Sequence, residues 1–208
     1  QHHRTRHGYL ADELGPVGEL LRATSVAAAV VCRLPTDPWE ELTALRSAQE
    51  EQPWEMLLLT EAPGIAPAAN AAALARALLV AASLDATLFV EPLVDMDRTM
   101  DVTHGLLDTL CNPRPTFELA RCAAALARNA VGSTLSVQTR ADCEIVSLGD
   151  LRLLLAQEAT ASTPLGELLP GGGERRVCDL TTATITAFDP SRCLTPADGP
   201  LLVYEPSS

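Results

Sequence analysis

Aromatic residues are scarce in this chain, at 3% of 208 residues, and the 15 basic residues are outnumbered by 27 acidic ones. A formal net charge of −12 argues against nucleic acid as a partner, because a nucleic-acid-binding protein needs a basic face to displace counterions. An anionic membrane surface is disfavoured for the same reason. No apolar run reaches the roughly 18–20 residues that span a bilayer, so we expect no membrane partner.

Motifs for metals and cofactors are also missing. The cysteines are scattered along the chain, at Cys32, Cys111, Cys122, Cys143, Cys178 and Cys193. None forms a C-x-x-C pair or has a histidine at ligand spacing, which favours structural thiols over disulfides and disulfides over a metal site. The glycine run Gly171–Gly173 lacks the Lys-Ser/Thr of a phosphate-binding loop, and no G-x-S-x-G motif is present. We therefore expect neither a cofactor nor a metal.

Helix and strand patterns alternate in the first 130 residues. Apolar runs predict strands over Val26–Arg33, Glu55–Thr60 and Ala86–Val90. Helical spacing of apolar residues predicts helices over His7–Ala23, Trp39–Glu51, Asn70–Ser83 and Pro115–Arg128. Such alternation is typical of a parallel α/β arrangement. Three strands cannot close an eight-stranded barrel, so this part is either the last third of a barrel or a small open sheet.

The pattern changes after Arg128. Short strand candidates separated by turns follow at Ser133–Thr139, Glu144–Leu148, Leu151–Ala156, Arg176–Leu180, Ala183–Phe188 and Leu201–Tyr204. Short strands at this spacing predict a small antiparallel, β-sandwich-like domain. The boundary falls near 129–133, which gives a first domain over 1–130 and a second over 131–208.

Two of the predicted parallel strands stop at a carboxylate. Glu61 ends the apolar run at 57–60, and Glu91 ends the run at 88–90. In β/α barrels the chemistry lies at the C-terminal ends of strands, so we expect both carboxylates at one edge of the sheet. The alternative, purely structural interpretations are a helix cap or surface ion pair for Glu61, and a buried acid paired with an arginine such as Arg98 for Glu91.

Short phrases of the chain resemble the large clan of retaining (β/α)₈-barrel glycoside hydrolases. GLLDTLCNPRPTFELAR (Gly105–Arg121) is similar to the segment after their eighth strand, and MLLLTEAPG (Met56–Gly64) is similar to their seventh strand. The closing phrases CDLTTATIT and LLVYEP resemble the small β-domain that follows such barrels. The resemblance implies an α/β plus all-β fold, with the last strands and helices of a TIM barrel (strands six to eight) before a small antiparallel β-sandwich-like domain.

The same resemblance implies a function. It predicts retaining hydrolysis of O-glycosidic bonds on a carbohydrate substrate, with Glu61 as the nucleophile and Glu91, Asp95, Asp97 and His104 in contact with the sugar. Hydroxyl-rich ligands need several fixed donors and acceptors, which the loop at 91–104 offers, although loop charges are commonly only solvated. The clan's acid/base glutamate has no counterpart here, so we expect it in an N-terminal part of the same barrel that precedes Gln1.

One departure from the clan's pattern keeps a second interpretation open. The clan commonly has a tryptophan on strand eight, where this chain has Leu88-Phe89-Val90. The difference favours a non-catalytic relative that binds carbohydrate or serves as a scaffold.

Overall fold

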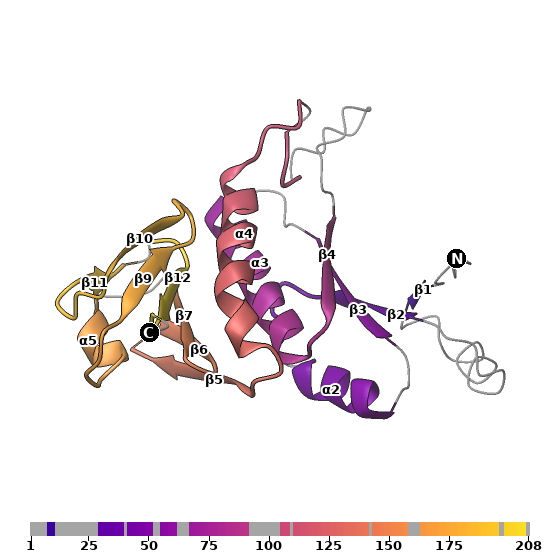
Figure 1. The fold of residues 1–208 in the computed structure, drawn as a ribbon, viewed down its shortest axis with the longest axis horizontal. Coiled ribbons are helices and arrows are strands. Elements are labelled where there is room, and N and C mark those ends of the chain that lie inside the picture. The colour runs from indigo at the N-terminus through magenta and orange to yellow at the C-terminus, as the bar shows by residue number, and fades with distance from the viewer. Residues whose placement is uncertain are drawn as a thin grey trace.

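The computed structural model shows a β-rich chain in which a layer of helices lies between two sheets (Figure 1). The structure describes residues 8–10, 29–39, 41–51, 55–61, 67–91, 105–108, 110–141, 143–157, 163–195 and 198–206. These residues form twelve strands and four α-helices. No helix among them is both long and apolar enough to cross a membrane.

A four-stranded parallel sheet forms the N-terminal side of the molecule. Its strands pair in the order β1 (Gly8–Leu10), β2 (Ala29–Leu34), β3 (Glu55–Glu61) and β4 (Thr87–Glu91). Helices α2 (Leu42–Glu51) and α3 (Pro67–Ser83) provide the crossovers that parallel pairing requires. Both helices share a hydrophobic cluster with the buried Leu58 of β3, so they cover the same face of the sheet.

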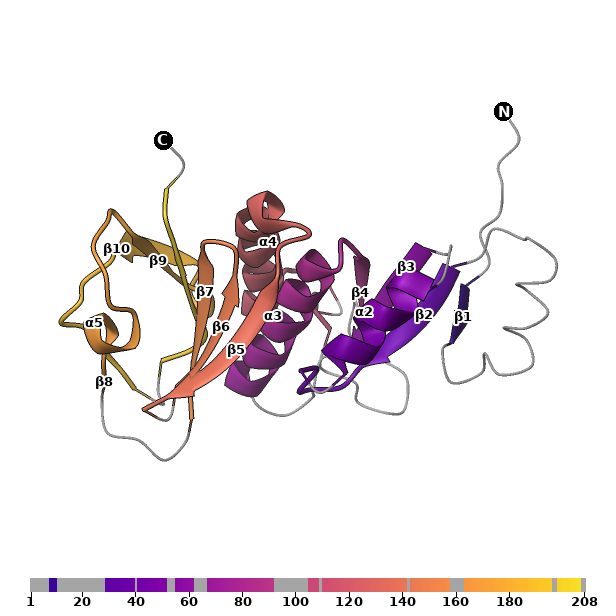
Figure 2. The same ribbon diagram turned by 90° about the horizontal axis from the view of Figure 1, so that it is seen from below.

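A six-stranded antiparallel sheet forms the other side, in the order β10-β9-β12-β7-β6-β5 (Figure 2). Its strands are β5 (Leu135–Arg140), β6 (Cys143–Leu148), β7 (Leu151–Ala156), β9 (Arg176–Asp179), β10 (Thr184–Ala187) and β12 (Leu201–Tyr204). Helix α4 (Pro115–Ala127) and the 3₁₀ turn η2 (Arg128–Ala130) lead into it. The short elements β8 (Thr163–Pro164), α5 (Leu165–Leu168) and β11 (Cys193–Leu194) complete the fold.

The central strands β6, β7 and β12 of the antiparallel sheet are buried on both faces. Along β7, Leu153 faces the cluster shared with α3 and α4, whereas the next residue, Leu154, faces a second cluster with Leu165 and Leu168 of α5. Both strand residues are fully buried, as the period of two in a strand requires when each face has a cover. We call the face toward α3 and α4 the inner face, and the face toward α5 the outer face.

The expected fold class is wrong. The largest sheet is antiparallel and is not a second layer of a β-sandwich, because helices α3 and α4 cover its inner face. The parallel strands form a small open sheet, with no pairing between β1 and β4 among the described residues. The chain is therefore not a TIM-barrel fragment. The expected boundary at 130/131 stays a prediction, and one hydrophobic cluster extends from Cys32 to Leu202 across it.

A buried polar contact joins the two sheets through the helical layer. The Glu144 side chain of β6 is 8% exposed and accepts hydrogen bonds from Arg76 Nε and Nη2 of α3, at 3.0 and 2.9 Å. Trp39 Nε1, between β2 and α2, donates to the same carboxylate at 2.9 Å. The Arg76–Glu144 pair has the bidentate geometry that makes such contacts strong and directional.

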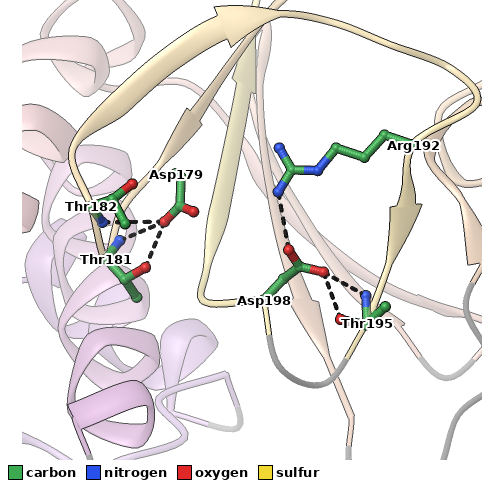
Figure 3. A network of polar contacts seen from close by, with 6 residues as sticks. All are labelled: Asp179, Thr181, Thr182, Arg192, Thr195 and Asp198. Carbon is green, nitrogen blue, oxygen red and sulfur yellow. Dashed lines mark hydrogen bonds and ion pairs between the residues drawn. The ribbon is translucent and has the colours of Figure 1, made fainter.

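Two aspartates order the turns of the antiparallel half (Figure 3). Asp179 Oδ1 accepts hydrogen bonds from the Thr181 hydroxyl at 2.6 Å and from the Thr181 N–H at 2.9 Å. Asp198 pairs with Arg192 at 3.0 Å and accepts from the N–H and hydroxyl of Thr195, both at 2.8 Å. Burial raises the pKa of Asp198, but the hydrogen bonds from Thr195 and Arg192 outweigh it, so that the pKa lies below the ordinary value.

We expect Asp198→Asn to destabilise the protein at neutral pH and not at low pH. A lowered folded-state pKa contributes stability above the unfolded pKa of about 3.9, and that stability is lost as the pH falls through the folded value. A partly exposed group of this kind is worth about 1 kcal/mol, or roughly 2–4 °C in Tm. Thermal melts at pH 7 and pH 2.5 check this. A Tm difference between wild type and variant that is equal at both pH values would contradict it.

The six cysteines are free thiols in very different surroundings. Burial is the main cause that raises the pKa of Cys143 to about 11, and burial together with the neighbouring Cys122 thiol raises the pKa of Cys178 to about 11. Cys111 is exposed. Because only the thiolate reacts, we expect iodoacetamide at pH 8 to label Cys111 within minutes and to leave Cys143 and Cys178 unlabelled until the protein is unfolded. Peptide mass spectrometry over time checks the order, and early labelling of Cys143 would contradict it.

Candidate functional site

Two carboxylate residues meet at the C-terminal edge of the parallel sheet. Glu61 is the last residue of β3 and Glu91 is the last residue of β4, and the two are direct partners in the strand register. Neighbouring strands lie about 4.8 Å apart, so the two Cα atoms are held at about that spacing by the sheet. The expected placement of both residues at strand ends on one edge is thus confirmed, and their chemical roles stay predictions.

An exposed aromatic side chain lies beside this pair. Phe89 of β4 is 51% exposed, and Glu91, two residues further on, is also exposed. Residues i and i+2 of a strand lie on the same face, so the ring and the carboxylate share the face of β4 that α3 does not cover. The intervening Val90 packs on the helical side. The sequence pattern predicts no role for Phe89 beyond the absence of the clan's tryptophan from this strand. The alternation of Thr87, Phe89 and Glu91 against two aliphatic residues was the signal that could have identified it.

Residues 105–108 and 110–114, from the phrase GLLDTLCNPRP, are joined by hydrogen bonds just before α4. The Asp108 carboxylate accepts hydrogen bonds from the N–H groups of Leu110 at 2.9 Å and Asn112 at 2.8 Å, and from Asn112 Nδ2 at 2.8 Å. These contacts, with the Asn112 side chain the largest, lower the pKa of Asp108. Leu107 and Pro113 form a β-bridge across the turn, and Pro115 then begins the helix, where proline is favoured. In this structure the phrase orders the chain at the start of α4.

The remaining expected site residues, Asp95, Asp97 and His104, lie outside the described residues. Within the described ranges, no three side chains from histidine, cysteine, aspartate and glutamate come together as a metal site would require. The candidate site therefore consists of Glu61, Glu91 and Phe89. Comparisons with family models, with curated proteins and with solved structures gave no match to this chain.

Proposed function

We propose that the protein hydrolyses O-glycosidic bonds with retention of configuration, and that Glu61 is the nucleophile. The single observation that supports this proposal most is the register pairing of Glu61 with Glu91. Register partners on neighbouring strands are spaced at about 4.8 Å, so the strand end that carries Glu61 lies next to the one that carries Glu91. The sheet therefore holds the proposed nucleophile and the proposed sugar-binding residue at adjacent strand ends.

Phe89 adds the second requirement of a sugar site. Carbohydrate sites combine apolar or aromatic surface with a few fixed polar groups, and Phe89 provides exposed aromatic surface on the same strand face as Glu91. Pyranose rings present apolar C–H faces that can lie against such a ring. In this arrangement Phe89 supports the sugar, Glu91 accepts hydrogen bonds from its hydroxyls, and Glu61 attacks the anomeric carbon.

The chemistry proceeds in two steps. The Glu61 carboxylate forms an ester with the anomeric carbon while the C–O bond to the leaving group breaks and its electron pair departs with the oxygen. Water then hydrolyses that ester and releases the sugar with its original configuration. A leaving group that departs as an anion needs no proton, so an activated aryl glycoside tests the first step independently of any acid.

Trapping of the glycosyl-enzyme tests the proposal. The full chain is incubated with 2,4-dinitrophenyl 2-deoxy-2-fluoroglycosides of several hexoses, digested and analysed by peptide mass spectrometry. We expect a fluoroglycosyl group on Glu61, and we expect Phe89→Ala to raise KM several-fold while leaving the Tm within about 1 °C, because exposed positions contribute little to stability.

Label on another carboxylate would refute the assignment of Glu61. Absence of label with all sugars, together with measurable binding of a neutral sugar that Phe89→Ala weakens, would favour the non-catalytic carbohydrate-binding alternative.

A further inference from the structure

A groove of about 820 Å³ lies on the outer face of the antiparallel sheet. Its floor includes one row across three strands, because Ser136 of β5 is paired with Ser147 of β6, and Ser147 with Arg152 of β7. Register partners share a face, and the next partner in this row, Val203, belongs to the cluster under α5. The floor therefore carries two hydroxyls and a guanidinium side by side, where the next row on the same face carries Gln138 and the buried Ile145 and Leu154.

Three guanidinium groups border the groove, and backbone carbonyls hold each of them. Arg152 Nη1 donates to the Leu151 carbonyl at 2.8 Å, Arg140 Nη1 to the Glu167 carbonyl at 3.0 Å, and Arg175 Nη1 to the Leu169 carbonyl at 3.0 Å. Among the described residues, neither Arg140 nor Arg152 has a carboxylate within 4.0 Å, whereas Arg175 lies 4.0 Å from Glu205. A guanidinium has five N–H donors, so both unpaired groups keep donors for a ligand in a fixed orientation.

The charged residues around the groove indicate which class of ligand it binds. Arginine supplies all 15 Lys+Arg residues of a chain with net charge −12, and three of them border this groove. Asp150 and Glu205 also line it, so a bare inorganic anion meets two carboxylates as well as the arginines. A ligand with one carboxylate and several hydroxyls satisfies both sets, because its carboxylate accepts from guanidinium and its hydroxyls donate to Asp150 and Glu205.

We propose that this groove binds an acidic sugar, a hexuronate unit whose carboxylate is held by Arg152 and whose hydroxyls contact Ser136, Ser147 and the flanking carboxylates. The antiparallel sheet, whose outer face carries the groove, lies on the opposite side of helices α3 and α4 from the parallel sheet that carries Glu61 (Figure 1). It is a second site, and its occupancy does not depend on the chemistry of the first.

Calorimetric titration of the full 208-residue chain with three probes tests the proposal. We expect digalacturonate to bind, the neutral analogue galactobiose to bind at least tenfold more weakly, and inorganic phosphate to give no measurable heat. Arg152→Gln should lower the affinity for digalacturonate at least tenfold, and Ser147→Ala several-fold. Arg121→Gln is the matched control, since it removes one guanidinium from the exposed surface of α4 and should leave the affinity unchanged.

Amide chemical-shift changes on adding digalacturonate locate the site if Arg152→Gln lowers the Tm by more than a few degrees. Shifts centred on Ser136, Ser147 and Arg152 support the proposal. Equal binding of phosphate or galactobiose, an unaltered affinity in Arg152→Gln, shifts centred elsewhere, or no binding of digalacturonate would each overturn it. Glu61→Gln should bind digalacturonate as the wild type does, which separates this result from that of the glycosidase test.

Discussion

Glu144→Ala is expected to lower the free energy of unfolding by about 3–5 kcal/mol, because it leaves the largely buried Arg76 cation without its partner. For a chain of this size that corresponds to a fall of roughly 10 °C in Tm. The Arg76 side chain is 18% exposed and makes two hydrogen bonds to Glu144, and Trp39 loses its acceptor as well. The measurement is thermal and urea unfolding followed by circular dichroism.

A matched control at an exposed ion pair distinguishes the effect of burial from the effect of removing one charge. Glu118 pairs with Arg121 at 2.7 Å on α4, with side chains 39% and 66% exposed, and Glu118→Ala should cost less than about 1 kcal/mol. The double variant Arg76→Met/Glu144→Leu should recover most of the stability lost in Glu144→Ala, because no charge is then left unpaired. If Glu144→Ala is as mild as Glu118→Ala, the Arg76–Glu144 contact does not hold the two sheets together.

The pairing of Arg76 with Glu144 could not be predicted from the sequence pattern. In the sequence, Arg76 is one polar residue within a predicted alanine-rich helix, and Glu144 is the first residue of a short predicted strand. They lie 68 positions apart, and nothing periodic connects them. Their pairing depends on which face of β6 meets α3, and that is decided by packing across the whole chain.

The strands themselves were largely predictable from the sequence, whereas the elements that pack on their two faces were not. Most predicted strands agree with the structure to within two residues, including Leu151–Ala156 and Leu201–Tyr204. Buried runs such as that of β6 indicate a strand with two covered faces, but they do not say whether helices or a second sheet cover them. That ambiguity produced the β-sandwich expectation. Gly8–Leu10 is a strand rather than the start of a helix, because pairing with β2 outweighed the helical spacing.

The barrel expectation failed for a related reason. Alternating helices and strands specify parallel neighbours and right-handed crossovers, and the parallel pairing of β2 with β3 and of β3 with β4 agrees with them. Closure depends on pairing between the first and last strands, which is non-local and leaves no local signal. Glu61 and Glu91 were predictable as neighbours because their positions depend only on adjacent strands. Phe89 was missed because the alternation along β4 indicates two different faces but does not say which of them the helices leave uncovered.

Glu61→Gln is expected to lower turnover of a 2,4-dinitrophenyl glycoside at least about a thousandfold, while KM and the Tm change little. Glutamine keeps the size of the side chain but cannot form the glycosyl ester, so the loss falls on the chemical step. Glu91→Gln should instead raise KM, because a residue that accepts hydrogen bonds from the sugar contributes to binding without forming a bond to carbon. Glu118→Gln, an exposed glutamate on α4, is the control for the loss of one charge.

Steady-state kinetics on the sugar that gives the trapped intermediate distinguishes these outcomes. Near-normal turnover in Glu61→Gln would remove Glu61 from the mechanism, and a thousandfold loss in Glu91→Gln alone would transfer the nucleophilic role to β4.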